Sequence, residues 1–475
     1  MTCLQHWSIR FRPARSRADR KDRRLIVELG SSGTVSLIDI GRSFSWSRWS
    51  RLSRRIREES LPQLQSRYCG TGRTSPHRCC ESPELLRGQQ RVTSTQIDET
   101  EIRIIDDGAA PTRFARGWHC LGLADSFRGG KPHPVEAFGT KLVVFADSTG
   151  TLKILDAYCR HMGGDLSQGA IKGDTVACPF HDWRWGGDGR CKDIPYARRV
   201  PPLARTRSWA AMEQDDLLFV WNDPEGNPPP PEVAVPVMRT ADAEWTEWVW
   251  KSLTIDTNCR EIIDNVVDMA HFFYVHLSFP VYFKNVFENH VAVQYFEGRS
   301  REDVRPKVTD GSKPNLVASH STAAYYGPSF MIDELDYEYD TMTLNSVLAT
   351  CHYPVSANKF VLMYGVTVKK TPELLGDEAV ELARNHSTFI SQGFEQDVAI
   401  WKNKTRINNP LLSAEDGPVY QLRRWHEQFY VDVADITPDM VARFEFEMDT
   451  SKAVESWTKE VQANIVRQVA ENPVG

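Results

Sequence analysis

Two short segments that each pair a cysteine with a histidine constrain this chain more than any other feature. Cys159 and His161 form a Cys-x-His pair, and after 16 further residues Cys178 and His181 form a Cys-x-x-His pair. Glycines allow a backbone to turn tightly around a shared ligand, and four of them lie in or between the two segments, at 163, 164, 169 and 173. The ten cysteines of the chain do not form a spaced disulfide framework. The sequence therefore predicts a four-ligand metal site built on two β-turns.

The way in which the ligands are paired indicates the metal. Zinc accepts two cysteines and two histidines, but the zinc-finger pattern ends in two histidines on a helix, whereas each pair here mixes the two residue types. Mixed pairs suit a two-iron cluster in which one iron takes both thiolates and the other takes both imidazoles, which is the Rieske [2Fe–2S] arrangement. With the flanking Pro179 and Trp183, the segments resemble the Rieske family. Gly164 and Phe180 stand where respiratory-chain members carry a further cysteine, so the oxygenase or ferredoxin branch is expected.

A second group of ligand residues lies in the segment DNVVDMAHFFYVH. It places Asp268, His271 and His276 in an Asp-x2-His-x4-His pattern. These histidines would be about 140° apart around an ideal helix, so both can reach one metal only if the helix ends or bulges between them. Two histidines and one carboxylate form the facial triad of non-haem iron(II) oxygenases. Spacing leaves the carboxylate open between Glu395 and Asp397, because two residues apart on a helix they face opposite ways.

Charge separates the first 90 residues from the rest of the chain. They hold 18 Lys and Arg against 8 Asp and Glu, whereas the remaining residues hold 39 against 55. An Arg-rich start can be a basic arm for nucleic acid or acidic lipid. No folded motif accompanies the charge here, so we predict a disordered extension and no nucleic-acid partner. No methionine lies between Met1 and Met162, and a folded composition begins at Val92. Residues 1–91 are therefore expected to be disordered or untranslated, with synthesis starting at Val92.

Four consecutive prolines at 228–231 mark the expected domain boundary. We predict a Rieske domain with its N-terminal lead-in over 92–225, a Pro-rich linker over 226–240 and a catalytic domain over 241–475. No apolar run reaches the 18 or so residues that cross a bilayer, and no signal peptide opens the chain, so we expect no membrane span and a cytoplasmic location. Residue periodicity predicts strands within 141–159, 216–226, 244–256, 339–354 and 358–370, and helices within 259–276, 381–403 and the last 35 residues.

Longer stretches of the chain resemble one branch of the Rieske non-haem iron oxygenases. The segments ARGWHCLG, VEAFGTKLVVFAD, CPFHDWRWGGDGRCK, CREIIDNVVDMAHFFYVH, YYGPSFMI, KTRINNPLL and VYQLRRWHEQFYVDVADI are similar to the oxygenase components of 3-ketosteroid 9α-hydroxylases. The resemblance implies an α+β fold, in which a β-rich Rieske domain precedes a helix-grip (START-like) catalytic domain with an antiparallel sheet and helices. It also implies hydroxylation of 3-ketosteroids of the 4-androstene-3,17-dione type at the 9α position with O2, in sterol catabolism.

The same resemblance implies cofactors, ligands and partners. The four residues of the first site would hold a [2Fe–2S] Rieske cluster, and His271, His276 and Asp397 would hold a mononuclear Fe(II). In a homotrimer, Asp268 would hydrogen-bond to His271 of its own subunit and to His181 of the partner subunit, and so couple the two metals. Electrons would come from an NADH-dependent reductase component with a flavin and an iron–sulfur centre.

Two alternatives share the metal motifs: a Rieske oxygenase for another cyclic substrate, and a Rieske electron carrier with a large accessory domain. Iron content separates the second of these, since a carrier holds two irons per chain and an oxygenase three. A steroid needs a largely apolar pocket. The aromatic candidates for its wall are Phe272, Phe273, Tyr274, Tyr282, Phe283, Tyr325, Tyr326 and Phe330.

Overall fold

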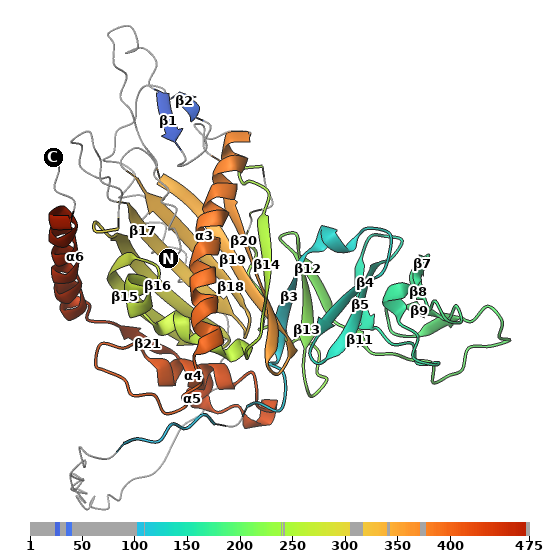
Figure 1. The fold of residues 1–475 in the computed structure, drawn as a ribbon. Helices are drawn as coiled ribbons and strands as arrows, with labels where there is room; N and C mark the ends of the chain where they lie inside the picture. Colours follow the sequence, from blue (N-terminus) through green and yellow to red (C-terminus); the bar gives the residue numbers. More distant parts are fainter. Residues whose placement is uncertain are drawn as a thin grey trace, which may run out of the picture. The chain divides into compact units, whose positions relative to one another are not determined.

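The computed structural model divides the chain into two compact units, Met1–Ile104 and Ile105–Gly475 (Figure 1). The residues that the structure describes are 24–28, 35–39, 102–108, 110–238, 240, 243–304, 317–339, 343–370 and 377–471. In the first unit, β1 (Arg24–Glu28) pairs with β2 (Val35–Asp39) in antiparallel fashion, which the sequence did not predict. The predictions for the rest of this extension, including a translation start at Val92, lie outside the described residues. None of the described helices is both long and apolar enough to cross a membrane.

Three small antiparallel sheets make up the part of the chain that carries the first group of predicted metal ligands. Their strand orders are β12-β13-β3, β11-β6-β5-β4 and β10-β9-β8-β7. The elements are β3 (Gly117–Leu123), η3 (Ala124–Phe127), β4 (His133–Ala137), β5 (Thr140–Ala146), β6 (Leu152–Asp156), η4 (Leu166–Gln168), β7 (Ala170–Lys172), β8 (Thr175–Ala177), β9 (Arg184–Gly186), β10 (Cys191–Asp193), β11 (Ser208–Trp209), β12 (Ala211–Gln214) and β13 (Leu217–Asn222). The predicted turn between β5 and β6 forms because the Asp147 carboxylate accepts hydrogen bonds from the backbone N–H groups of Thr149 and Thr151.

A single eight-stranded antiparallel sheet forms the centre of the C-terminal part, in the order β14-β20-β19-β18-β17-β16-β15-β21. Its strands are β14 (Val249–Ile255), β15 (Ser278–Glu288), β16 (Val291–Ser300), β17 (Ala318–Tyr326), β18 (Phe330–Glu338), β19 (Thr343–Ser356), β20 (Lys359–Val368) and β21 (Phe444–Glu447). The helices are η5 (Cys259–Glu261), η6 (Ile263–Val267), α2 (Ala270–Tyr274), α3 (Asp377–Asn403), α4 (Val419–Glu427), η7 (Val433–Asp435), α5 (Pro438–Val441) and α6 (Ser451–Glu471). Most neighbouring strands are also consecutive in sequence, so short turns build most of the sheet.

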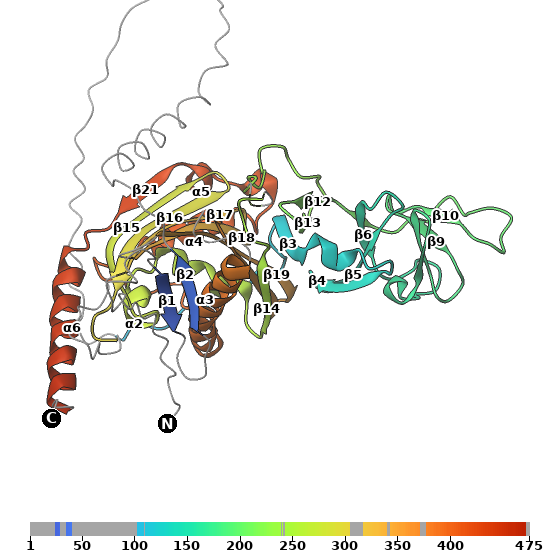
Figure 2. The same cartoon turned by 90° about the horizontal axis from the view of Figure 1, so that it is seen from above.

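Both faces of this sheet are covered. On one face, Phe330 packs against Phe219 of β13, with 4.9 Å between the ring centroids. On the other face, Leu348 and Tyr364 share a core with Trp401 of α3. Figures 1 and 2 show α3 lying across the strands β18 to β20 on that face. The layer between α3 and the sheet is therefore where side chains from distant parts of the sequence can meet.

The architecture confirms the predicted α+β fold with a β-rich first domain and an antiparallel sheet that carries helices. The segment 259–276 differs from the prediction, because it contains η5, η6 and α2 in place of one helix. The break occurs at Asp268, whose extended backbone (φ −94°, ψ 99°) separates η6 from α2. Strands β15 to β18 were also not predicted, although Asn289 makes a recognisable two-residue turn between β15 and β16 with φ 53°.

Candidate metal centres

The first site lies on two loops that close on themselves. In one loop, the N–H of Cys159 donates to the carbonyl of Gly164, and the N–H of Gly163 donates back to the carbonyl of Cys159, both at 2.9 Å. In the other, the N–H of Cys178 donates to the carbonyl of Trp183 at 2.9 Å. These bonds join the ends of each loop and hold its side chains in a fixed direction.

The two loops bring their cysteines and histidines together. The rings of His161 and His181 lie 4.7 Å apart between centroids, and the side chains of Cys159 and Cys178 are both buried in the same core cluster. Nδ1 of His181 is buried without a hydrogen-bond partner, which a metal-binding nitrogen would explain. A Cβ atom on Gly164 would lie 2.6 Å from Sγ of Cys178, so only glycine leaves room for that sulfur. This donor set fits a two-iron cluster.

One contact of the first site was not predicted from the sequence. The indole N–H of Trp185 donates a hydrogen bond to Sγ of Cys159 at 3.3 Å, and the ring is fully buried. The ring of Trp183 stacks on His161 with 4.6 Å between centroids, but its N–H donates to the hydroxyl of Tyr196. The sequence feature that could have predicted this contact is the position of Trp185, a large aromatic residue only four residues after His181.

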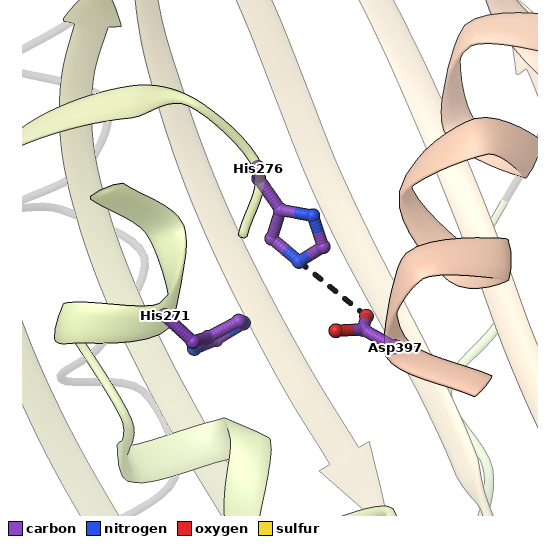
Figure 3. A group of neighbouring side chains, drawn as sticks. All are labelled: His271, His276 and Asp397. Atoms are coloured by element: carbon purple, nitrogen blue, oxygen red, sulfur yellow. Dashed lines mark ion pairs between the residues drawn. The ribbon is translucent and has the colours of Figure 1, made fainter. Parts of the chain in front are cut away.

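His271, His276 and Asp397 converge from two distant parts of the chain (Figure 3). One ligand atom from each lies within 4.8 Å of the others, and Nε2 of His276 is 3.4 Å from Oδ2 of Asp397. The two imidazole rings are 5.0 Å apart between centroids, with 77° between their planes. Two imidazoles and one carboxylate gathered in this way can hold an Fe(II) ion and leave further coordination positions open.

The chain leaves the helical path between the two histidines. The backbone N–H groups of Val275 and His276 both donate to the carbonyl of His271, at 2.7 Å and 3.3 Å. The second bond joins residues i and i+5, so the turn is wider than that of an α-helix. Leu277 then adopts φ 55° and directs the chain into β15. The wide turn brings the imidazole of His276 toward that of His271. Two histidines five residues apart need such a bulge in the helix to reach one metal, as the sequence predicted.

The carboxylate comes from the buried side of α3. Asp397 is 6% exposed, whereas Glu395 is exposed, so of the two candidates only Asp397 faces the histidines. One turn further on, Trp401 anchors the helix in the core beneath it. One turn earlier, a Cβ atom on Gly393 would touch Nδ1 of His276 at 3.5 Å, which shows how closely the imidazole approaches the helix.

Asp268 contacts the imidazole of His271 through its backbone carbonyl, while its carboxylate Oδ1 accepts a hydrogen bond from the backbone N–H of His271 at 3.2 Å. Nδ1 of His271 lies 2.5 Å from the carbonyl oxygen of Asp268, and because a carbonyl only accepts, Nδ1 carries the proton and Nε2 is left for a metal. Burial lowers the pKa of His271, which favours the neutral imidazole that metals bind. The carboxylate Oδ1 of Asp268 is 3.9 Å from the same nitrogen, and the side chain is 51% exposed. This carboxylate is therefore accessible at the surface beside the site.

Phe272 lies against the second site and is itself packed on two further phenylalanines. The ring of Phe272 lies 5.7 Å from that of His276 and stacks on Phe296 at 4.5 Å, and Phe283 lies 6.3 Å from Phe272. Other aromatic residues that were candidates for a pocket wall lie elsewhere. Phe273 packs on Trp457 of α6, Tyr274 is exposed, Tyr282 contacts Glu447, Tyr325 packs near α4, and Tyr326 and Phe330 pack on the face toward the first domain.

Comparison with known proteins agrees with this geometry. Two family models match the chain: the Rieske [2Fe-2S] domain over residues 117–204 and the 3-Ketosteroid 9alpha-hydroxylase C-terminal domain over residues 220–430. A 3-ketosteroid-9-alpha-monooxygenase oxygenase component of Rhodococcus rhodochrous is 65% identical over 374 residues, which cover 78% of this chain and 94% of the relative. The chain belongs to this family.

Further comparisons support membership of the 3-ketosteroid-9-alpha-monooxygenase oxygenase components. The family member from Mycobacterium tuberculosis is 59% identical over 78% of this chain and 96% of its own length. The crystal structure of dicamba monooxygenase bound to 3,6-dichlorosalicylic acid shares the fold, with a TM-score of 0.55 at 18% identity, and the match covers 66% of this chain and 97% of that chain. As an oxygenase component of the Rieske type, the protein carries a [2Fe–2S] cluster and a mononuclear iron, and both predicted cofactors are thereby confirmed.

Proposed function

We propose that this protein is the terminal oxygenase that hydroxylates 3-ketosteroids at the 9α position, with O2 and electrons from a reductase. The observation that carries the proposal is the convergence of His271, His276 and Asp397, in a chain whose close relatives bear this activity in their names. Phe272 and Phe296 add an apolar surface beside the metal ligands. Such a surface suits a steroid nucleus, which offers few polar groups beyond its ketones. A bare electron carrier would have no need of this second site.

Each residue then has a role in the reaction. The two cysteines and two histidines of the first site would hold the cluster, and His271, His276 and Asp397 would hold the iron. When bound, the cluster supplies single electrons and the iron activates O2 for insertion into a C–H bond. The backbone carbonyl of Asp268 keeps the proton of His271 on Nδ1. The phenylalanines beside the metal ligands would exclude water and hold the substrate with one edge toward the iron. The shape of this apolar surface would then select the carbon that reacts.

The proposal includes a homotrimer in which the cluster of one subunit serves the iron of the next. Four large apolar residues beside the first site are at least half exposed, and exposed apolar patches mark interaction surfaces: Tyr158, Met162, Phe180 and Tyr196. The accessible carboxylate of Asp268 would then bridge to His181 of the partner subunit. The reductase would be an NADH-dependent flavin and iron–sulfur protein, and the reaction would occur in the cytoplasm.

A single-turnover experiment tests the activity. Anaerobically purified, chemically reduced protein is mixed with 4-androstene-3,17-dione and 18O-labelled O2, and the product is analysed by mass spectrometry. One labelled oxygen at a ring carbon is expected. Absence of product from protein with three irons per chain would refute the steroid substrate but retain the oxygenase. Two irons per chain, with a normal Rieske spectrum, would refute the second metal site.

A further inference from the structure

Trp185 is held rigidly against one sulfur of the first site. Its ring is fully buried in a core that includes Val176, Leu166 and both cysteines of the loops. Its indole N–H reaches Sγ of Cys159 at 3.3 Å, and this is its one hydrogen bond among the residues that the structure describes. The N–H group therefore has a fixed direction, and that direction points to the sulfur.

The pairing of donor and acceptor indicates what the contact is for. A buried indole N–H needs a partner, because leaving it unpaired costs a large part of its solvation free energy. The sulfur of a neutral thiol is only a weak acceptor. A thiolate bound to iron carries negative charge and accepts much more strongly. The contact is therefore best matched to Cys159 in its cluster-bound form, and the inference rests on the proposed ligand role of that residue.

We propose that Trp185 raises the reduction potential of the Rieske cluster by donating its indole N–H to the sulfur of Cys159. Reduction adds one negative charge to the cluster. A hydrogen-bond donor aimed at a ligand sulfur stabilises the more negative, reduced state, and hydrogen bonds to sulfur are one of the means by which proteins set the potential of iron–sulfur clusters. Removing the donor makes the cluster harder to reduce. Trp185 therefore acts through the ligand Cys159 and favours the transfer of an electron to the cluster.

Trp183 provides a matched comparison within the same loop region. It is also a tryptophan close to a cluster ligand, with its ring stacked on His161 at an interplanar angle of 6°. Its N–H, however, donates to the hydroxyl of Tyr196 at 2.7 Å and not to sulfur. A Trp183→Phe variant removes a hydrogen bond and keeps an aromatic ring against His161, so it should leave the potential unchanged.

The test measures the midpoint potential of the cluster in the full-length protein by dye-mediated titration, followed by electron paramagnetic resonance. Two changes are made at position 185: Trp185→Phe, and replacement by 3-benzothienyl-alanine, in which sulfur takes the place of the N–H in a ring of almost the same shape. The analogue keeps the test valid if the smaller phenylalanine disturbs folding. At a fixed potential, the ratio of reduced to oxidised cluster should fall about three- to tenfold, where tenfold corresponds to about 59 mV for a one-electron couple.

The outcomes separate this inference from the proposed function. A lowered potential in both position-185 proteins, with Trp183→Phe unchanged, supports the inference. An unchanged potential in the benzothienyl protein, or an equal shift in Trp183→Phe, would overturn it. A Cys159→Ser variant that retains a normal Rieske spectrum would instead refute the ligand assignment on which the proposed function rests.

Discussion

Asp333 is a buried carboxyl group whose charged neighbours are also acidic, and this makes the stability of the protein depend on pH. The side chain lies on β18, is 8% exposed, and accepts one hydrogen bond from the hydroxyl of Ser321 at 2.6 Å. The pKa of Asp333 is raised from its ordinary 3.8 to about 7, chiefly by burial; Glu334 and Asp336 add to the rise, and the hydrogen bond from Ser321 opposes it. The folded protein therefore binds this proton more tightly than the unfolded chain does.

The sign and size of the effect follow from linkage. Because the pKa of the folded state is the higher one, stability is lost as pH rises from 3.8 through 7. With about 1.4 kcal/mol per pKa unit, the loss is about 1.5 kcal/mol at pH 5 and about 4 kcal/mol at pH 8. An Asp333→Asn variant cannot ionise, and its amide oxygen can still accept from Ser321. Relative to the wild type, the variant should gain about 2.5 kcal/mol between pH 5 and pH 8.

Urea denaturation followed by tryptophan fluorescence at pH 5, 6, 7 and 8 measures this gain. A constant offset at all pH values would reflect the altered hydrogen bond, so only the slope with pH bears on the carboxyl group. Glu338→Gln is the control, because Glu338 lies on the same strand, is exposed and is not among the groups that shift the pKa of Asp333. A difference between Asp333→Asn and the wild type that stays constant over this pH range would refute the reasoning.

Three further predictions concern the metal centres and the buried histidines. Asp397→Ala should lower the iron content from three to two per chain and abolish product while leaving the Rieske spectrum intact. The control Glu395→Ala, on the exposed side of the same helix, should change neither the iron content nor product formation. Metal analysis and single-turnover assays measure these two quantities. Asp268→Asn should keep three irons but slow product formation about 10- to 100-fold, because it removes the accessible carboxylate next to the iron ligand; normal turnover would contradict the proposed bridge. Burial lowers the pKa of His119 and of His426 to about 4, so the folded state favours their neutral forms. Stability should therefore fall as pH drops below 6.5, by about 2 kcal/mol per histidine at pH 5. A His426→Gln variant whose thermal melting is as acid-sensitive as that of the wild type would argue against this.

Elements with one clear periodicity were predictable from the sequence. The strands β19 and β20 pair in the expected hairpin, and α3 covers the expected helical segment. Strands β15 to β18 were missed for a physical reason that Asp333 illustrates. On β18, a buried acid at 333 is followed by an exposed acid at 334, so polar residues occur on both faces and the alternation of apolar residues is lost. Burial of an acid depends on its surroundings in the folded sheet, which a local pattern does not contain.

The site shows the same division between local and long-range information. The types and spacings of the ligands follow from local sequence, because each pair sits on one loop or one short segment. The choice of Asp397 over Glu395 depends on which side of α3 faces the sheet, and that is set by packing around Trp401. The contact from Trp185 to Cys159 joins strand β9 to the first loop. The hydrogen bond between the Asp268 carbonyl and the His271 imidazole depends on the extended conformation of the single residue Asp268.

The separation of His276 from Asp397 by about 120 residues makes the second metal site a cross-link as well as a reaction centre. Its histidines precede β15, and its carboxylate is supplied by a helix that follows all the strands from β15 to β20. During synthesis at 5 to 20 residues per second, the carboxylate is added about 6 to 24 seconds after the histidines. The iron site can therefore be completed only after Asp397 has been synthesised, and a bound ion would close a long loop that ties α3 to the segment before β15.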